Sequence, residues 1–188
     1  MKNAGQIVGG NSAFGRVASD YYPTPPDVTE SLLKYLDLPK DVMIWEPACG
    51  EGHMVKVLRD AGYLTFASDI RCTGFGKGGI DFLKADRSFG EWIITNPPFA
   101  LAEDFIRKAR SMDVSFAMLL KSQYWHSKKR FPLFKEITPS AILPLTWRPD
   151  FLFKQRGSGS PLMDVMWCVW DKNSQNTSPI YVPLERGG

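Results

Sequence analysis

Short apolar runs that alternate with helix-like segments constrain the fold of this chain more than any other feature. The run 42–46 is followed by a glycine-rich turn and by the helix-like segment 53–61. The same kind of run recurs at 64–68 and at 92–95, and the helix-like segment 102–110 follows the second of these. Strands that alternate with helices predict an α/β sheet in which most strands run parallel.

Further elements extend this pattern on both sides. Apolar residues on one face predict a first helix over 28–36, with Thr24 or Asp27 as its N-terminal cap. Additional strands are predicted over 115–120, 141–145 and 165–170, and residues 122–134 are predicted to form a helix or a lid. We expect a flexible arm over 1–20, a single domain over 21–172 and a tail over 173–188.

Composition limits the kinds of site that the chain can carry. Of its 188 residues, 44% are hydrophobic, which is enough to bury the core of one domain. The three cysteines form no CxxC pair and only two histidines are present, so we expect neither a disulfide framework nor a metal site. No apolar run is long enough for a membrane span or a signal peptide, which predicts a soluble protein of a reducing compartment. The net charge of +3 is weak support for a polyanionic partner.

The turn after the first strand has the features of a nucleotide-type cofactor site. Residues 46–52 place glycines where the backbone must turn sharply, and Glu46 can accept a hydrogen bond from a cofactor ammonium group. Asp69 ends the next strand about twenty residues later, the spacing at which a carboxylate can bind both hydroxyls of a ribose. Asp81 and Phe82 add an acceptor beside an aromatic face, which suits an adenine ring. Each feature alone also fits an ordinary turn or core position, so their combination is what indicates the cofactor.

The third strand ends in Asn-Pro-Pro-Phe, at residues 96–99. The exocyclic nitrogen of adenine is a poor nucleophile because its lone pair is delocalised into the ring. The Asn96 side-chain oxygen and the Pro97 carbonyl can accept its two hydrogens and hold them out of the ring plane, on a loop that the prolines stiffen. Positioning and electrostatics would then supply the rate, and Phe99 would stack on a base swung out of its helix. The structural alternative is a rigid turn with a buried aromatic ring.

Together these motifs resemble the class I S-adenosylmethionine-dependent amino-methyltransferases, and within them the small phage- or prophage-type DNA adenine methylases. The resemblance covers residues 20 to 171, and the order of cofactor loop before catalytic loop is similar to the gamma arrangement. It implies a Rossmann-like fold with a mainly parallel seven-stranded sheet, helices on both faces and a C-terminal antiparallel strand. It also implies S-adenosylmethionine as the cofactor, methylation of the exocyclic amino nitrogen of adenine in DNA, and a place in the cytoplasm of a bacterium or a phage-infected cell.

The resemblance also assigns roles to individual residues. It places cofactor contacts at Tyr22, Thr24, Pro25, Glu46, Pro47, Ala48, Gly50, Gly52, Asp69, Ile70, Asp81, Phe82 and Asn96. It gives the catalytic roles to Asn96, Pro97, Pro98 and Phe99. Separately, two segments mix cations with aromatic rings, as is typical where phosphates and unstacked bases are bound. From these segments we predict nucleic-acid contacts at Lys121, Tyr124, Trp125, Lys128, Lys129, Arg130, Arg148, Lys154 and Arg156, although each residue also fits a solvated face or a partly buried ring.

Two departures from the family pattern leave the substrate open. Many DNA adenine methylases have Asp first and Tyr last in the catalytic loop, whereas this chain has Asn96 and Phe99. Asn-Pro-Pro loops also serve enzymes that methylate ribosomal RNA bases or a glutamine amide in protein. No target-recognition domain is recognisable, which predicts a relaxed sequence preference on DNA, the favoured partner. The alternative from another class is a non-catalytic cofactor-binding or DNA-binding module. The sequence leaves the recognition sequence, the strandedness of the substrate, the oligomeric state and the role of the arm open.

Overall fold

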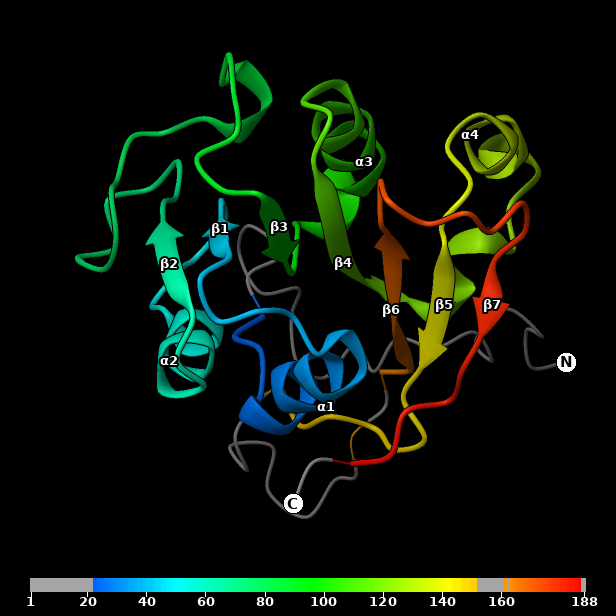
Figure 1. The fold of residues 1–188 in the computed structure, drawn as a ribbon, viewed down its shortest axis with the longest axis horizontal. Coiled ribbons are helices and arrows are strands. Elements are labelled where there is room, and N and C mark those ends of the chain that lie inside the picture. The colour runs from blue at the N-terminus through cyan, green and yellow to red at the C-terminus, as the bar shows by residue number, and fades with distance from the viewer. Residues whose placement is uncertain (1–21, 152–160, 162, 187–188) are drawn as a thin grey trace, which may run out of the picture.

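A computed structural model describes residues 22–151, 161 and 163–186 of the chain. These residues form a seven-stranded sheet in the order β2-β1-β3-β4-β6-β5-β7 (Figure 1). The strands are β1 (Met43–Glu46), β2 (Leu64–Ala67), β3 (Trp92–Thr95), β4 (Ser115–Lys121), β5 (Ala141–Pro144), β6 (Val165–Trp170) and β7 (Ile180–Tyr181). Strands β1 to β4 pair in parallel, β6 is antiparallel to both β4 and β5, and β7 is parallel to β5. The predicted mainly parallel sheet with an antiparallel strand near the C-terminus is confirmed.

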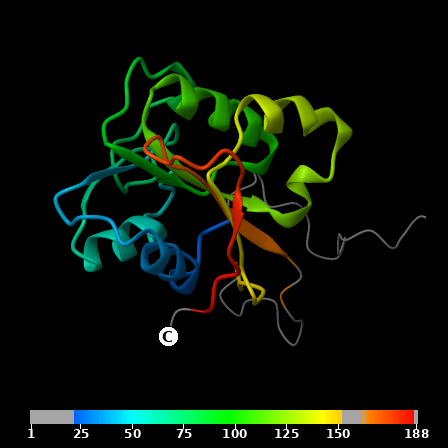
Figure 2. The ribbon, with the colours of Figure 1, turned by 45° about the vertical axis from the view of Figure 1, so that its right-hand side comes forward.

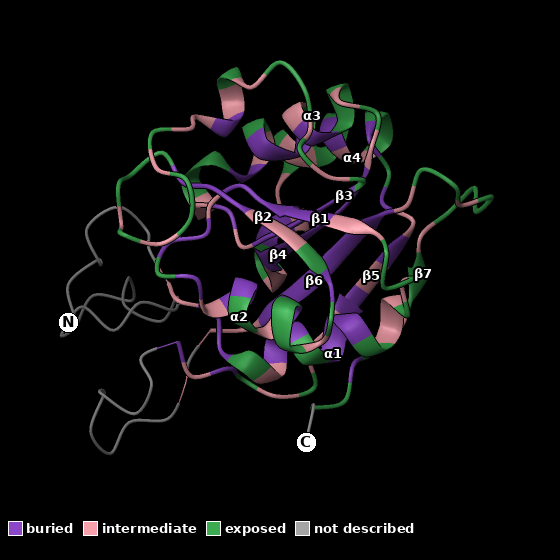
Figure 3. Ribbon diagram, turned by 60° about the vertical axis from the view of Figure 1, so that its left-hand side comes forward, coloured by how far each residue is buried: buried purple, intermediate pink, exposed green. Residues whose placement is uncertain are grey.

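Helices cover both faces of the sheet, as expected. Helices α1 (Pro26–Leu36) and α2 (His53–Asp60) lie against one face, while α3 (Ala102–Ser111) and α4 (Phe131–Glu136) lie against the other (Figure 2). Successive strand residues point to opposite faces, so Ile94 packs in the core under α1 and α2, whereas Ile93 packs in the core under α3. Because both faces of the sheet are covered, strands in its middle are buried. Strand β6 is buried along its whole length and is drawn in purple in Figure 3.

The first helix begins earlier than its apolar pattern predicted, and the predicted cap is wrong. The helix starts at Pro26, and neither Thr24 nor Asp27 caps it, because the N-cap position falls on Pro25 and carries no side-chain hydrogen bond. Proline is suited to this first turn, since its backbone angle is preset and its missing N–H has no partner there in any case. Asp27 lies within the first turn, where a negative charge interacts favourably with the helix dipole.

The structure corrects one further expectation and refines another. Residues 122–134, predicted to form a helix or a lid, do not form one helix but three short pieces, the 3-10 turns η4 (Ser122–Trp125) and η5 (Lys128–Arg130) followed by α4. Pro132 explains the break, because a proline is tolerated in the first turn of a helix but not in its interior. Within the expected tail over 173–188, Ile180–Tyr181 form β7 and pair with β5. The expected arm over 1–20 lies outside the described residues.

The strand order creates one crevice at the carboxyl ends of the parallel strands. Strand β1 pairs with β2 on one side and with β3 on the other. The chain therefore goes from β1 to its neighbour on one side, β2, and then crosses to β3 on the opposite side of β1. Open α/β sheets bind ligands at such a switch point. Glu46 at the end of β1 and Asn96 just after β3 both line the cavity at this point.

Candidate active site

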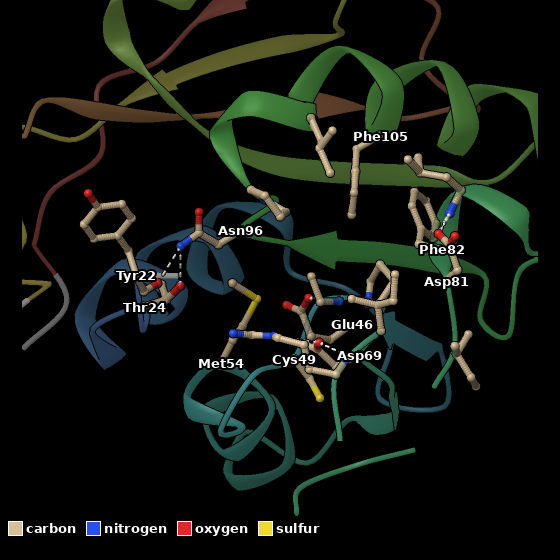
Figure 4. Close-up of a pocket in the computed structure, with 18 of the residues that line it drawn as sticks. Tyr22, Thr24, Glu46, Cys49, Met54, Asp69, Asp81, Phe82, Asn96 and Phe105 are labelled. Carbon is tan, nitrogen blue, oxygen red and sulfur yellow. Dashed lines mark hydrogen bonds and ion pairs between the residues drawn. The ribbon is translucent and has the colours of Figure 1, made fainter. Parts of the chain in front are cut away.

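A cavity of about 600 Å³ lies at this switch point (Figure 4). Its wall combines the segment before α1, the turns after β1 and β2, the 3-10 turn η2 (Phe82–Lys84), and the segment from the end of β3 into α3. It includes the following residues that the sequence predicted as cofactor contacts: Tyr22, Thr24, Glu46, Pro47, Ala48, Asp69, Ile70, Asp81, Phe82 and Asn96. The size and the mixture of apolar walls with a few polar groups are typical of a small-molecule site.

Three of the predicted cofactor contacts do not line the cavity. Pro25 is buried at the start of α1, and the two turn glycines shape the backbone instead. Gly50 has a positive φ of 51° and donates its N–H to Asp69 Oδ2 over 2.9 Å. A Cβ at Gly52, where φ is 81°, would lie 2.2 Å from the ring of Phe75. The close approach that Gly52 permits is therefore to a side chain of this chain.

Other cavity residues were not named as contacts by the sequence analysis, although Cys49 lies within the predicted cofactor turn 46–52. They are Pro23, Cys49, His53, Met54, Arg71, Ile80, Leu83, Ala100, Leu101 and Phe105. Most of them adjoin a predicted motif, whose extension by a few residues would include them, but Phe105 lies within α3, where the sequence shows only a core position. Burial, together with the nearby carboxylates Glu46 and Asp69, raises the pKa of the Cys49 thiol to about 12. Cys49 thus stays protonated at neutral pH, which argues against a nucleophilic role.

Glu46 is a buried carboxyl group at the end of β1. It is 1% exposed, and its Oε1 accepts hydrogen bonds from Thr95 Oγ1 at 2.5 Å and from the Ala48 N–H at 3.0 Å. Burial, with a smaller contribution from the nearby Asp69, raises its pKa to about 8 in spite of these hydrogen bonds. A cation placed against Glu46 would restore the carboxylate, because an opposite charge favours the ionised form. The site therefore suits a ligand that carries a positive group.

Asp69 is buried just after the end of β2, and both of its carboxylate oxygens already accept hydrogen bonds. Its Oδ1 accepts from the Arg71 N–H at 2.8 Å and from Arg71 Nε at 3.2 Å. Its Oδ2 accepts from the Gly50 N–H at 2.9 Å and from Arg71 Nη2 at 3.3 Å. These four donors match the roughly four lone-pair sites of a carboxylate. A ribose could bind Asp69 through both hydroxyls only after the Arg71 side chain withdraws.

An apolar slot adjoins these two carboxyl groups. Ile70 and Leu101 are 63% and 40% exposed although both are large apolar side chains, and both line the cavity. Phe82 packs at 4.7 Å from Phe105 between ring centroids, so it belongs to the core and also borders the slot. Asp81 caps η2 by accepting from the Leu83 N–H at 3.0 Å. A planar ring would cover the exposed apolar surface, with Asp81 at its edge.

The Asn-Pro-Pro-Phe loop at residues 96–99 follows β3 and borders the same cavity. Asn96 Nδ2 donates to the Tyr22 carbonyl at 3.0 Å and to Thr24 Oγ1 at 3.1 Å, and the Asn96 side-chain oxygen points away from both (Figure 4). Pro98 lines the cavity, whereas Pro97 is buried. Phe99, which follows Pro98, is half-buried. The ring of Phe99 lies 5.8 Å from that of Tyr22 and 4.5 Å from Lys121 Nζ. An oxygen acceptor and an aromatic ring thus lie together at the end of β3.

The predicted nucleic-acid residues are only partly surface groups. Tyr124 is buried, and burial raises the pKa of its hydroxyl to about 12. Trp125 donates Nε1–H to Cys168 Sγ at 3.4 Å, and the Arg130 guanidinium lies 4.2 Å from the Tyr124 ring centroid. The structure therefore corrects the expectation for Tyr124, which is a core residue and presents no face to a base.

The remaining cations differ in their surroundings. Lys128 and Lys129 are exposed, and Arg148 is exposed and paired with Asp164 at 2.7 Å. Lys154 and Arg156 lie outside the described residues. Within the described part of the chain, no helix has the length and apolar character to cross a membrane, and no cluster of three metal-ligating side chains occurs.

An open, doubly wound α/β sheet with a cavity at its switch point defines a class of fold that binds nucleotide-type ligands. No protein-family model and no curated protein matches the chain. Solved structures do match, among them a methyltransferase subunit of a type I restriction-modification system from Streptococcus thermophilus. It is 12% identical with a TM-score of 0.63, over 86% of this chain and 47% of that one. The chain thus spans about half the length of that subunit.

Two smaller proteins share the same architecture. A provisionally assigned class I S-adenosylmethionine-dependent methyltransferase from Listeria monocytogenes is 15% identical with a TM-score of 0.57, over 88% of this chain and 67% of that one. A provisionally assigned RNA methyltransferase from Pyrococcus horikoshii is 13% identical with a TM-score of 0.59, over 78% of this chain and 82% of that one. The fold of this chain is accordingly that of the class I S-adenosylmethionine-dependent methyltransferases.

Proposed function

We propose that this chain uses S-adenosylmethionine to methylate the exocyclic amino nitrogen of adenine in DNA. The observation that carries the proposal is the Asn96 side chain, whose amide nitrogen is held by Tyr22 and Thr24 while its oxygen is left to accept from a substrate amine. This oxygen acceptor borders the same cavity as Glu46 and Asp69. A cofactor site and an amine-binding group therefore share one cavity.

The residues of the cavity fit the cofactor. Glu46 would hold the ammonium group, because a cation would favour the ionised form of this carboxyl group with its raised pKa. Asp69 would hold the ribose once Arg71 withdraws. The exposed faces of Ile70 and Leu101 would enclose the adenine ring. When bound, the cofactor supplies an electrophilic methyl group on a sulfonium ion.

The chain contributes positioning and electrostatics to the reaction. Asn96 Oδ1 and the Pro97 carbonyl accept the two hydrogens of the target amine, which turns its lone pair out of conjugation with the ring. Positive charge would develop on this nitrogen as its bond to the methyl carbon forms and the carbon–sulfur bond breaks with its electron pair left on sulfur, and the two oxygens would stabilise that charge. One proton of the amine then passes to solvent. No side-chain base is needed, because the methylated amine is strongly acidic until that proton leaves.

Nucleic acid is the favoured substrate because an aromatic ring and a cation adjoin the catalytic loop. Phe99 offers a stacking surface for a base that has left its helix, with Lys121 beside it. Lys128 and Lys129 follow in the chain and are exposed, as phosphate contacts must be. Among the structural neighbours, one is named as a subunit of a restriction-modification system and another as an RNA methyltransferase. Both names agree with a nucleic-acid substrate.

The experiment that tests the proposal identifies the methylated product. The protein is incubated with methyl-labelled cofactor and, in parallel, with duplex DNA, single-stranded DNA, ribosomal RNA or a protein extract, and the labelled nucleoside is identified by mass spectrometry. We expect N6-methyladenine in DNA with wild-type protein and about a hundredfold less label, or lower still, with Asn96→Ala. Label in RNA or protein alone would overturn the DNA assignment, and tight cofactor binding without any transfer would favour a non-catalytic module.

A further inference from the structure

The segment that precedes α1 reaches the catalytic loop across more than seventy residues of sequence. The Tyr22 carbonyl and the Thr24 hydroxyl together accept from Asn96 Nδ2, at 3.0 Å and 3.1 Å, and Figure 4 shows both contacts on the side of Asn96 opposite its oxygen. Thr24 is 4% exposed, and Pro23 and Pro25 restrict the backbone on either side of it. The two acceptors are therefore held in place before any ligand binds.

We propose that Thr24 and the Tyr22 carbonyl are a positioning pair that locks the Asn96 amide in the one orientation able to accept from a substrate amine. This inference rests on the proposed function, because it specifies how the amine-binding oxygen is aimed. An amide has two orientations, and rotation by 180° would turn its NH2 group toward the substrate. That orientation sets donor against donor, so it cannot bind the amine.

The two partners play different parts in the lock. A backbone carbonyl can only accept a hydrogen bond, so the Tyr22 carbonyl rejects the rotated amide, whose oxygen would face it. The Thr24 hydroxyl can both donate and accept, so it strengthens the correct orientation without selecting it alone. The Tyr22 ring also contacts Phe99 and Phe151, at 5.8 Å and 6.1 Å between centroids, which holds this segment against the catalytic loop.

The lock also gives a physical reason for asparagine at position 96. An aspartate there would place a negative oxygen against the Tyr22 carbonyl, and two acceptors repel. A protonated aspartic acid would restore the pattern, since its hydroxyl can donate to Tyr22 while its carbonyl accepts from the substrate. Asn96→Asp should therefore be impaired at neutral pH and should recover as the pH is lowered.

Kinetics of a pair of matched variants test the role of Thr24. Thr24→Val keeps the shape and removes the hydroxyl, and we expect its kcat to fall about tenfold, the size of one hydrogen bond, with the cofactor Kd changed less than about threefold. Thr24→Ser keeps the hydroxyl and should retain kcat within about twofold of wild type. A Thr24→Val variant with unchanged kcat and a weakened cofactor Kd would overturn the inference, because Thr24 would then act as a direct cofactor contact.

A measurement without substrate separates this inference from the proposed function. In a 15N–1H spectrum of wild-type protein, the side-chain amide protons of Asn96, assigned by their loss in Asn96→Ala, should exchange with water more slowly than those of the exposed Asn176. The protection should fall in Thr24→Val and persist in Thr24→Ser. Rapid exchange in wild type would overturn the lock even if DNA is methylated. Slow exchange in a protein that methylates nothing would retain the lock and reject the function.

The pH dependence of the activity of Asn96→Asp is a further test of the lock. If Thr24 had a purely structural role, this pH dependence would not be expected. Relative to wild type at each pH, the activity of Asn96→Asp should rise as the pH falls toward the range in which a carboxylic acid is protonated. A flat ratio between pH 5 and pH 8 would contradict the requirement of the Tyr22 carbonyl for a donor.

Discussion

The Arg71 guanidinium spans both carboxylate oxygens of Asp69, with Nε 3.2 Å from Oδ1 and Nη2 3.3 Å from Oδ2. The Arg71 side chain is 41% exposed while that of Asp69 is buried, so the arginine has a solvent path along which to leave. In the proposed function, Asp69 binds the ribose of the cofactor, and the cofactor must then compete with Arg71 for the same lone pairs.

Removal of this competitor should tighten cofactor binding. Because the pair is partly exposed, its contribution is small, and we expect Arg71→Gln to lower the Kd for S-adenosylmethionine by about two- to fivefold. Titration calorimetry measures the effect, with Arg87→Gln as a control that removes the same charge outside the cavity. Weaker binding by Arg71→Gln would show instead that the arginine contacts the cofactor.

Asp69 itself should determine cofactor affinity rather than turnover. Asp69→Asn preserves the size of the side chain but removes its charge, and we expect the Kd to rise about 10- to 100-fold, the range for hydrogen bonds to a charged group. At saturating cofactor, kcat should change much less than Kd. A large drop in kcat with unchanged affinity would remove Asp69 from the ribose site.

Asn96 should show the opposite behaviour. Asn96→Ala removes an acceptor that acts on developing charge, so kcat should fall by about two to three orders of magnitude. The cofactor Kd should stay within about threefold of wild type, because a hydrogen bond made only to the substrate amine does not hold the cofactor. Rate measurements on labelled DNA test this, with the exposed Asn176→Ala as the matched control. A variant that keeps most of its activity would refute the catalytic assignment.

Glu46 should make the stability of the cofactor-free protein depend on pH. Its pKa is about 8 in the folded protein against an ordinary value of 4.5, so the folded state binds the proton more tightly. The resulting stabilisation is fully present below about pH 4.5 and is lost as the pH rises through about 8. The melting temperature should therefore fall between pH 5 and pH 9, and Glu46→Gln should flatten this decline. Equal slopes for the two proteins would contradict the raised pKa.

The exposed lysines after β4 should contribute to affinity for nucleic acid through phosphates alone. Replacing both Lys128 and Lys129 with Gln should weaken binding to different DNA sequences by a similar factor, because interactions with phosphates carry no sequence information. On duplex DNA, the slope of log Kd against log salt should decrease by about 0.9 for each phosphate that the protein no longer neutralises. Fluorescence anisotropy over a range of salt concentrations measures this slope. An unchanged slope would place the DNA elsewhere on the surface.

Local features of the sequence were enough to predict most of the strands and the turns that carry the site. The apolar runs of β1, β3 and β4 lie where they were predicted, because their alternation with helical segments reflects nearby residues. The sheet has the seven strands that the resemblance implied, but the position of the seventh was not predicted, since Ile180–Tyr181 is a two-residue strand whose pairing with β5 leaves no periodic pattern. Of the predicted helix or lid over 122–134, a single continuous helix is wrong, because Pro132 is tolerated only in the first turn of a helix and so makes α4 begin late.

The sequence by itself determined the parallel α/β architecture, the glycine turn after β1 and the Asn-Pro-Pro-Phe loop after β3, since periodicity and turn chemistry are encoded in neighbouring residues. Only the tertiary structure decided which groups meet. It set Thr24 against Asn96, placed Arg71 on Asp69, brought Phe105 to the cavity and buried Tyr124. These contacts depend on burial and on pairing between distant segments, which follow from how the helices and strands pack and not from the spacing of residues along the chain.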